Sequence, residues 1–586
     1  MKHPDTLMAA AAADAGEMAN YPMHYMGAPV AMTTAPNGAV IGEKAFHARR
    51  AVGYHALTVE QVAEGVWLVG GYSIANTAVI EAPEGLIVYD TGSDREEGLR
   101  LRAIIEEQIS RKPVRAVIYS HSHYVHGTGA LVDDAAQVPV YGHPLLNGSM
   151  GGSGFAAIPE LLPVLMARLL VQFGNFLPDE GEDAALGARI TKKGTDAFLP
   201  VTRPVQNGET VRVAGMDLQF FTEHVSDDHN VTVWLPKQKV VLNNFFWPGT
   251  PNLYTMRGAI YRDPQVWRDG LRVIRDLQPE HLLNTHARTI SGARQVQEAL
   301  TRYMDLITLT YDQTLRGILR GLGAEELRHF IYQPRALSEP YYNAQTYGET
   351  PWFPPAIYQY QMGWYNGDAT ELMRLPPGES SARLVALMGG ADQVVAAAQT
   401  AFDKKEYAWA AELVQHVCRI DPDHAAARAL KVRALRVLGQ VSPSSIGRAF
   451  CLSAARALEG RENVPIAVPP APGLVTADPA RYVNMFRVRI DPRRGEHVDK
   501  VLSFRFGDKA AGLHVRNGIV EFLPEPAQYL RQADIALAMD AAVWERLYLD
   551  PAEFAALAQS GQVRVTTGSV EEAAAVFALF DRLGAA

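Results

Sequence analysis

Three kinds of hydrophobic pattern follow one another along the chain. Over 66–90, apolar residues alternate or run together between Gly and Pro, as they do in β-strands. Helical spacing follows at 95–109, and then another strand pattern at 114–120. Further strands are predicted at 218–224, 230–236 and 239–245, and a helix at 263–277. Because strands and helices interleave up to about residue 300, we expect an α/β domain there.

The pattern changes after about residue 300. Up to about 460 it is typical of amphipathic helices rich in Ala and Leu. A helix pair joined at 403–407 resembles one tetratricopeptide-like repeat, but the sequence has no clear second copy. The proline-rich stretch 463–479 is predicted to be a linker. After it, strands predicted at 486–491, 501–508 and 512–524, followed by helices, indicate a small α+β domain.

Composition supports a multidomain globular protein. The chain has 586 residues, which is too long for one hydrophobic core. Of these residues 48% are hydrophobic and 20% are charged, as in an ordinary globular protein. A net charge of -9 argues against a nucleic-acid partner. Its two cysteines, Cys418 and Cys451, are far apart and are most simply interpreted as small buried apolar residues.

The amino-terminal residues 1–50 are predicted to form an irregular arm. Their apolar run is short and is interrupted by Asp14 and Glu17, which is not typical of a signal peptide. No stretch reaches the roughly 18 apolar residues that an integral membrane segment needs. We therefore expect a cytoplasmic enzyme.

Three histidines follow the strand at 114–120 within six residues: His121, His123 and His126. In an extended segment the first two side chains share one face, and the turn after them brings the third alongside. Ligand sites of α/β folds lie at the carboxyl ends of strands. Since imidazole suits zinc and similar metals, this loop is a candidate metal site rather than a set of solvated histidines.

The histidine loop, together with the segment around Asp90, resembles the metallo-β-lactamase superfamily. The resemblance implies an αββα sandwich. The stretch 222–244 is similar to the second ligand region of that superfamily, and 282–292 to the region of its last ligand histidine, here His286.

Segments further along the chain resemble the alkyl sulfatase branch of the superfamily. They are 363–377, 388–417 and 419–439, which are similar to the dimerisation domain of that branch. The end of the chain resembles its sterol-carrier-like domain, which forms an apolar groove. The resemblance implies a homodimer and the following domain order: a metallo-β-lactamase-like catalytic domain at 51–335, an all-α dimerisation domain at 336–462, the linker at 463–479 and a small α+β sterol-carrier-like domain at 480–586.

The alkyl sulfatase branch implies a two-zinc site. By the resemblance, His121 and His123 bind one zinc together with an acidic residue, most simply Glu223. His224, Asp227 and Asp228 compete for that role. His126 and His286 would bind the second zinc.

The stretch 251–263 is similar to the sulfate-binding segment of the branch. The resemblance assigns Asn252 and Arg257 to the sulfate oxygens, with Arg262 nearby. Arginine suits this role because its planar fork pairs two oxygens of a tetrahedral anion. Outside this motif, Arg257 would be interpreted as part of a surface ion pair.

Three positions depart from the pattern of the branch. Val125 replaces an aspartate that binds the second metal, and Asn243 is aligned with a glutamate at the metals. Trp352 or Phe353 is aligned with a histidine that serves as proton donor. We therefore expect one secure metal and a second that is weaker, differently bound or absent, unless Asp227 or Asp228 takes the missing place. Asn243 still offers a neutral oxygen to the catalytic site.

The apolar segment 151–177 is predicted either to cover the site or to form a plain buried helix. Three functions remain open. The first is hydrolysis of a sulfate ester of an apolar alcohol by a metal-activated water. The second keeps the fold and one metal but cleaves another ester or a lactone. The third is a non-enzymatic dimer that binds apolar molecules.

Overall fold

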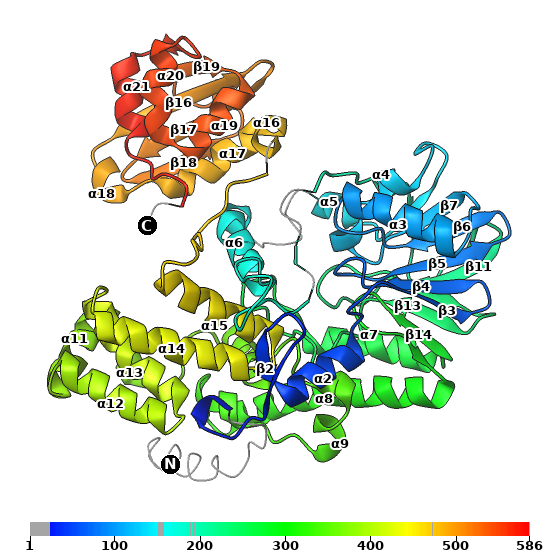
Figure 1. Ribbon diagram of the computed structural model, residues 1–586. Helices are drawn as coiled ribbons and strands as arrows, with labels where there is room; N and C mark the ends of the chain where they lie inside the picture. The colour runs from blue at the N-terminus through cyan, green and yellow to red at the C-terminus, as the bar shows by residue number, and fades with distance from the viewer. Residues whose placement is uncertain (1–23, 151–157, 188, 191–193, 472, 585–586) are drawn as a thin grey trace. The chain divides into compact units, whose positions relative to one another are not determined.

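The computed structural model describes residues 24–150, 158–187, 189–190, 194–471 and 473–584 (Figure 1). The chain forms two compact units. One comprises the described residues of Met1–Gly154 and Leu170–Val464, and the other those of Phe155–Leu169 and Pro465–Ala586.

The first unit contains two β-sheets that pack face to face. The seven-stranded sheet has the order β3 (Thr58–Ala63), β4 (Val66–Gly70), β5 (Thr77–Ala82), β6 (Gly85–Tyr89), β7 (Val114–Ile118), β8 (Val140–Gly142), β9 (Arg203–Pro204). The six-stranded sheet has the order β10 (Thr210–Val213), β11 (Met216–Phe221), β12 (Thr232–Leu235), β13 (Val240–Asn243), β14 (His281–Asn284), β15 (Ile290–Ser291). Val66 and Leu68 from one sheet share a hydrophobic core with Val233 and Leu242 from the other.

Helices cover the outer faces of both sheets. Helix α3 (Arg95–Gln108) places Leu101 and Ile104 in a core with β-strand residues of the first sheet. Helices α7 (Pro264–Asp276) and α8 (Ala293–Leu319) form a separate core with the second sheet. The short helices α4 (Thr128–Leu131) and α5 (Leu146–Ser149) lie in the loops of the first sheet. The structure thus confirms the predicted αββα sandwich (Figure 1).

Strand direction explains where a site can form. Strand β7 pairs in parallel with β6 and β8, and β13 pairs in parallel with β14. The histidine loop leaves the carboxyl end of β7, and His286 follows the carboxyl end of β14. The loops after parallel strands meet at one edge of a sheet, so the sandwich brings these segments together.

The amino-terminal region is more ordered than the predicted irregular arm in the part that the structure describes. Strands β1 (Met32–Thr34) and β2 (Val40–Gly42) pair antiparallel, and helix α2 (Glu43–Val52) follows. Residues 1–23 lie outside the described part of the chain.

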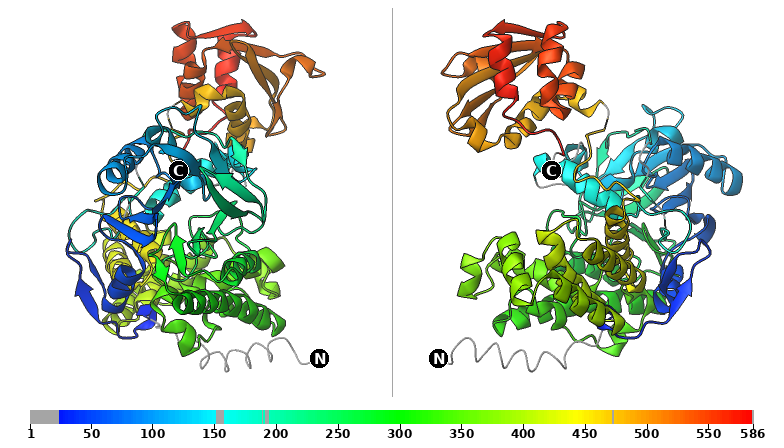
Figure 2. Two further views of the ribbon diagram at one scale, coloured as in Figure 1. Left: turned by 90° about the vertical axis from the view of Figure 1, so that its right-hand side faces the viewer. Right: turned by 60° about the vertical axis from the view of Figure 1, so that its left-hand side comes forward.

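The region after the sandwich is helical, as predicted. Its α-helices are α9 (Arg335–Ser338), α10 (Phe353–Met362), α11 (Pro377–Leu387), α12 (Ala391–Asp403), α13 (Tyr407–Ile420), α14 (Ala425–Val441) and α15 (Ser445–Leu458). Helices α12, α13 and α14 lie side by side around a small apolar core (Figures 1 and 2). Cys418 and Cys451 in this region are half-buried and form no disulfide.

The second unit contains the carboxyl-terminal α+β fold. Its sheet has the order β18 (Ile519–Leu523), β17 (Lys509–Arg516), β16 (Asp499–Phe506), β19 (Ile535–Met539), β20 (Val563–Thr567). Its helices are α16 (Leu474–Ala477), α17 (Pro479–Phe486), α18 (Pro492–Gly495), α19 (Ala541–Leu549), α20 (Phe554–Gln559) and α21 (Val570–Phe577). The strand predicted at 486–491 is wrong. Asp478 caps helix α17, and Phe486 at its end packs on Trp544 and Phe580.

A segment from within the sandwich sequence groups with this second unit. The 3₁₀ helix Pro159–Leu161 leads into α6 (Leu162–Gln172). Glu160 forms an ion pair of 2.7 Å with Arg487, and the Pro163 carbonyl accepts a hydrogen bond from the Val468 amide. The segment predicted to cover the site therefore divides between the two units, and residues 151–157 lie outside the described part of the chain.

Candidate metal centre

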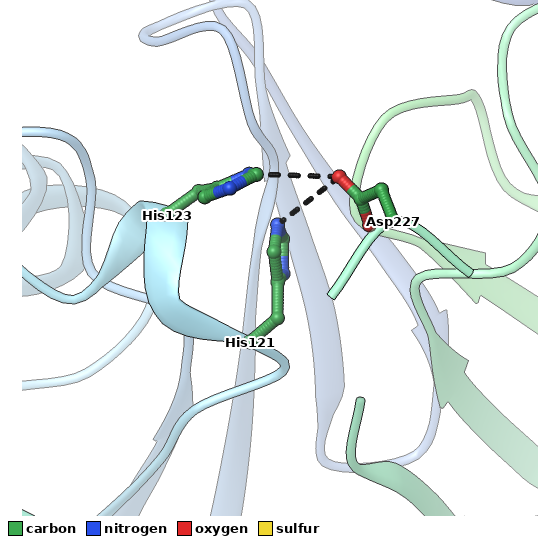
Figure 3. Close-up of side chains that lie close together, drawn as sticks. All are labelled: His121, His123 and Asp227. Carbon is green, nitrogen blue, oxygen red and sulfur yellow. Dashed lines mark ion pairs between the residues drawn. The ribbon is translucent and has the colours of Figure 1, made fainter. Parts of the chain in front are cut away.

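Two histidines of the loop after β7 point toward one carboxylate, that of Asp227 (Figure 3). The distance from His121 Nε2 to Asp227 Oδ2 is 4.0 Å, and that from His123 Nδ1 to the same oxygen is 3.5 Å. One ligand atom from each of the three side chains lies within 4.8 Å of the others. His121, His123 and Asp227 thus form a candidate metal group. Among the described residues, this is the one group of His, Cys, Asp or Glu side chains with such spacing.

Asp90 fixes the backbone of the histidine loop. It follows β6 in a left-handed conformation with φ of 64°, and its Oδ1 accepts a hydrogen bond of 2.8 Å from the Ser120 amide. Its other oxygen accepts one from Thr285 Oγ1 at 3.3 Å. Ser120 Oγ in turn lies 2.7 Å from His121 Nδ1, which leaves the Nε2 atom to face Asp227. That Nε2 atom is buried and has no hydrogen-bond partner among the described residues, as expected for a ligand atom.

Burial and charge set the protonation of the three side chains. Burial lowers the pKa of His121 to about 4 and that of His123 to about 4. Burial alone raises the pKa of the Asp227 carboxyl, but His121, His123 and Arg262 reverse this and hold the pKa below its ordinary value. At neutral pH the imidazoles are thus neutral and the carboxylate is ionised. Metal ions bind these groups in that state, so the donor set fits a divalent cation.

The other candidates of the second ligand region lie elsewhere. Glu223, expected as the simplest acidic ligand, is exposed, and its Oε2 accepts a hydrogen bond from Asn207 Nδ2 at 3.0 Å. His224 is half-buried and does not belong to the group of three. Asp228 accepts hydrogen bonds from Ser122 Oγ and from the His229 amide. It therefore fixes the loop next to the centre.

The side chains expected at the second metal are not brought together. Val125 is 0% exposed and belongs to the apolar core under α3. His126 is partly exposed, and its Nδ1 lies 2.9 Å from Asp196 Oδ1. His286 does approach the first group, with its ring centroid 6.1 Å from that of His121 and its Nε2 buried without a partner among the described residues. Burial lowers the pKa of His286 to about 3.

Two neighbouring asparagines at the end of β13 have different surroundings. Asn243 Nδ2 donates to the Leu283 carbonyl and to Asn284 Oδ1, and its Oδ1 accepts from the amides of Phe245 and Phe246. These bonds occupy its side chain within the fold. Asn244 Nδ2 instead donates to Asp227 Oδ1 at 2.8 Å, and its Oδ1 is buried without a partner among the described residues. The asparagine that contacts the metal group is therefore Asn244, one position beyond the expected Asn243.

The predicted sulfate-binding residues lie close to the metal group. Asn252 is buried, and its Nδ2 donates to Thr255 Oγ1 at 3.0 Å. Arg257 and Arg262 are 5% and 7% exposed. The charge of Arg262 acts on His121, His123 and Asp227, and that of Arg257 acts on His123. Two largely buried cations thus lie near the candidate metal site, where they favour a negatively charged ligand.

Arg262 is also held in place by its neighbours. Its Nη1 donates to the Asn252 carbonyl at 2.8 Å, and its guanidinium lies 5.5 Å from the centre of the Trp247 ring. The same ring lies 5.1 Å from that of His286. Arg262 therefore links the predicted sulfate-binding stretch to the wall of the metal centre.

Two tyrosines at the centre were missed in the sequence. The Tyr124 ring lies 5.3 Å from each of the His121 and His286 rings. Burial raises the pKa of the Tyr347 phenol, although Tyr347 is close enough to Arg262 and Arg257 for their positive charges to lower this pKa in part. Trp352, aligned with the expected proton donor, sits instead against Gly447, where an added Cβ would lie 3.1 Å from the Trp352 ring.

Comparison with known proteins agrees with this architecture. Residues 70–242 match the model of the metallo-beta-lactamase superfamily, and residues 324–461 match that of the alkyl sulfatase dimerisation domain. A linear primary-alkylsulfatase of Pseudomonas sp. is 32% identical over 480 residues, which cover 77% of this chain and 90% of the relative. An (R)-specific secondary-alkylsulfatase of Pseudomonas sp. is 27% identical over 485 residues, covering 78% of this chain and 72% of that one.

A solved structure shares the fold over most of the chain. The stereoselective inverting sec-alkylsulfatase Pisa1 of Pseudomonas sp. superimposes with a TM-score of 0.74 at 22% identity, covering 98% of this chain and 96% of Pisa1. The sandwich and its histidine loop place the protein in the metallo-β-lactamase superfamily. Within it, the chain belongs to the alkylsulfatase family.

Proposed function

We propose that this protein is a metal-dependent hydrolase that cleaves sulfate esters of apolar alcohols. One observation carries the proposal: a metal-binding group made of His121, His123 and Asp227 lies within electrostatic reach of Arg257 and Arg262. A sulfate monoester carries a negative charge next to the bond that is cleaved. The site offers cations for that charge and a metal position beside it.

His121, His123 and Asp227 would hold one divalent ion, with zinc as the first candidate because two imidazoles and a carboxylate are common zinc ligands. When bound, such an ion supplies Lewis acidity that activates water or polarises an ester oxygen. Asn244 holds the Asp227 carboxylate through the 2.8 Å bond to Oδ1, which leaves Oδ2 facing the histidines.

The remaining residues would bind and orient the sulfate group. Arg257 and Arg262 supply planar donors for its oxygens, and Asn252 supplies an amide beside them. Trp352, at a position aligned with the proton donor of the branch, packs against Gly447 and carries an indole without an acidic proton. An alkoxide leaves poorly unless it is protonated, so we expect slow turnover of simple alkyl sulfates.

We further propose that the site binds one metal tightly and a second weakly or not at all. His126 faces Asp196, and position 125 offers no ligand atom. His286 is the one residue expected at the second metal that stays near the centre. With Asp227 already placed against His121 and His123, a second ion would have too few anionic ligands.

Two proposals concern the other domains. The helices of 336–462 would form a homodimer, since helices this rich in Ala and Leu need apolar partners and the matched family model is a dimerisation domain. The carboxyl-terminal domain at 480–586 would bind apolar tails as a sterol-carrier-like domain.

The part of the chain that the structure describes contains no helix with the length and apolar character of a membrane span.

A substrate panel with metal analysis tests the main proposal. We expect the purified protein to contain metal and to cleave a medium-chain alkyl sulfate in preference to the matching carboxylic ester or a lactone. Arg257→Gln should lower kcat/KM for the sulfate by a factor of about 100, because a bidentate contact to the anion is lost. The exposed Arg272 serves as control, and Arg272→Gln should change little.

Two results would decide for the alternatives. Faster cleavage of a carboxylic ester or lactone, with no effect of Arg257→Gln, would indicate a different hydrolase on the same fold. A protein that holds no stoichiometric metal after expression with added zinc, and that cleaves none of these substrates, would indicate a binding protein.

A further inference from the structure

A second pair of arginines, Arg448 buried and Arg49 half-buried, lines a cavity that also contacts Tyr347 and none of the candidate metal ligands. A cavity of ≈ 140 Å³ is lined there by Arg49 of α2, Arg448 of α15, Gln172 and Tyr347. Ser445 and Ala449, in the first turns of α15, form another part of the wall. A volume of this size holds several waters or one small oxyanion.

The two arginines have no carboxylate partner among the described residues. Arg49 donates to the carbonyls of Thr346 and Leu186, and Arg448 to those of Val40, Glu182 and Ala184. The charge of Asp183 acts on Arg448, but this carboxylate is itself paired with Arg436 through two hydrogen bonds of 3.1 Å. Two guanidinium groups whose charges repel each other therefore line one cavity with no carboxylate bonded to either, which is costly away from water.

The hydrogen bonds to backbone carbonyls do not use every N–H group of Arg448. Arg448 is 2% exposed, and its Nε is buried with no partner among the described residues. Burial lowers the pKa of both guanidinium groups to about 10, so both remain charged at neutral pH. The rest of the cavity wall is largely apolar, with Leu177 and Leu186 among its residues, so these charged N–H groups are its main donors to an oxyanion.

Neighbouring groups add to this preference. Helix α15 begins at Ser445, so the positive end of its dipole points to the same cavity, although Ser444 caps its first amides. Gln172 Nε2 now donates to Tyr347 Oη at 3.2 Å, and its Oε1 is buried without a partner among the described residues. If the carboxamide turns over, Tyr347 donates to Oε1 and the amide N–H groups face the cavity.

From this arrangement we infer that the cavity between Arg49 and Arg448 is a binding site for a small tetrahedral oxyanion, separate from the proposed catalytic sulfate position. Inorganic sulfate is the first candidate, and this choice alone rests on the proposed function, in which sulfate is the product. Tyr347 lines this cavity and also interacts electrostatically with Arg257 and Arg262 of the proposed catalytic site, so it is common to both sites. Occupancy would thus couple product concentration to the position of Tyr347.

Calorimetric titration of the full-length, metal-loaded protein with sodium sulfate tests the inference, with sodium chloride at equal ionic strength as reference. We expect two sulfates per chain in the parent protein. Arg49→Gln should remove or weaken by at least tenfold one of them, and Arg257→Gln the other. Arg50→Gln is the matched control, since Arg50 is adjacent in sequence, exposed, and lies over Phe46.

A variant that fills the cavity avoids the loss of the arginine bonds to backbone. Ala449→Leu should abolish the same sulfate that Arg49→Gln affects. In crystals soaked with selenate, an anomalous peak should appear between Arg49 and Arg448. No peak there, or equal sulfate binding by parent, Arg49→Gln and Ala449→Leu proteins, would overturn the inference.

The same titration separates this inference from the proposed function. A protein without sulfatase activity that still binds one sulfate sensitive to Arg49→Gln would keep the cavity site and refute the enzyme proposal. Replacing sulfate by phosphate distinguishes a product site from a general oxyanion site, and tighter binding of phosphate would overturn sulfate as the occupant.

Discussion

The two expected metal positions, or halves, of the centre differ in what surrounds them. At the first position, candidate ligand side chains face each other; at the second, an apolar side chain and a surface ion pair occupy the places of ligands. His121 and His123 face Asp227, which Asn244 and Ser226 hold by hydrogen bonds. In the other half, Val125 belongs to an apolar core and His126 pairs with Asp196 near the surface. The three histidines and Val125 come from one short loop, yet the two halves differ in chemistry.

The difference shows what one substitution in the loop entails. A valine at position 125 gains free energy from burial, so it packs under α3 rather than facing the centre. Position 125 offers no carboxylate that could share a metal with His126. The imidazole of His126 pairs with the exposed Asp196 instead. The neighbouring half keeps its geometry because Asp90 accepts a hydrogen bond from the Ser120 amide and Asp228 accepts one from the Ser122 hydroxyl, and neither bond involves position 125.

The largest expected effect comes from removing the carboxylate of the assembled half. Asp227→Asn should lower metal affinity by about 100-fold or more, because a neutral amide is a poor ligand and leaves the histidines uncompensated. Hydrolysis should fall with it. Elemental analysis after dialysis and turnover of an alkyl sulfate measure both.

Glu223→Gln is the matched control for this change, since Glu223 lies four residues earlier, is exposed and is not in the group of three. It should leave metal content and turnover near those of the parent. If instead Glu223→Gln loses the metal and Asp227→Asn keeps it, the assignment of the ligand is reversed.

The two asparagines at the end of β13 provide the next test. Asn243→Ala leaves the buried amides of Phe245 and Phe246 without acceptors, so we expect a loss of about 2–4 kcal/mol in the free energy of unfolding. Metal content should persist in the folded fraction. Asn244→Ala removes the bond to Asp227 and should cost less than about 1.5 kcal/mol while weakening the metal.

Urea unfolding and metal titration of both variants measure these effects. An Asn243→Ala protein as stable as its parent, but without metal, would show that Asn243 rather than Asn244 serves the centre.

Rebuilding the second half should produce a smaller, conditional gain. Val125→Asp adds a carboxylate to the histidine loop, and metal content should rise from about one ion per chain toward two. Without metal this protein should melt earlier than the parent, because a carboxylate at position 125 is buried in an apolar core. Added zinc should restore the melting temperature by binding only the folded state.

Val125→Asp carrying His126→Ala is the control and should fail to gain the second ion. Two tightly bound metals in the unaltered protein would refute the contrast between the halves.

Much of this architecture could be predicted from the pattern of residues, but the ligands could not all be identified. Periodicity found α3 and α7 because each buries one apolar face, and β7 was found from its apolar run, which is buried on both faces. The stretch between β11 and β12 has no such periodicity, so only packing with Ser226 and Asn244 selects Asp227 over Glu223. Asn243 was expected from its alignment with a glutamate of the branch, but a shift of one residue along a strand reverses the direction of a side chain, and Asn244 is the residue bonded to Asp227.

The smallest expected effect is also the sharpest check on the contrast. His126→Ala removes one of the three loop histidines, yet its imidazole faces Asp196 rather than His121. The pair is partly exposed, so its loss should cost less than about 1 kcal/mol. Metal content and kcat/KM should stay within about twofold of the parent, whereas His123→Ala, which removes an imidazole 3.5 Å from Asp227 Oδ2, should abolish both. A large loss of metal in His126→Ala would mean that this histidine turns inward when metal binds, and that the second half of the centre is built by the ion itself.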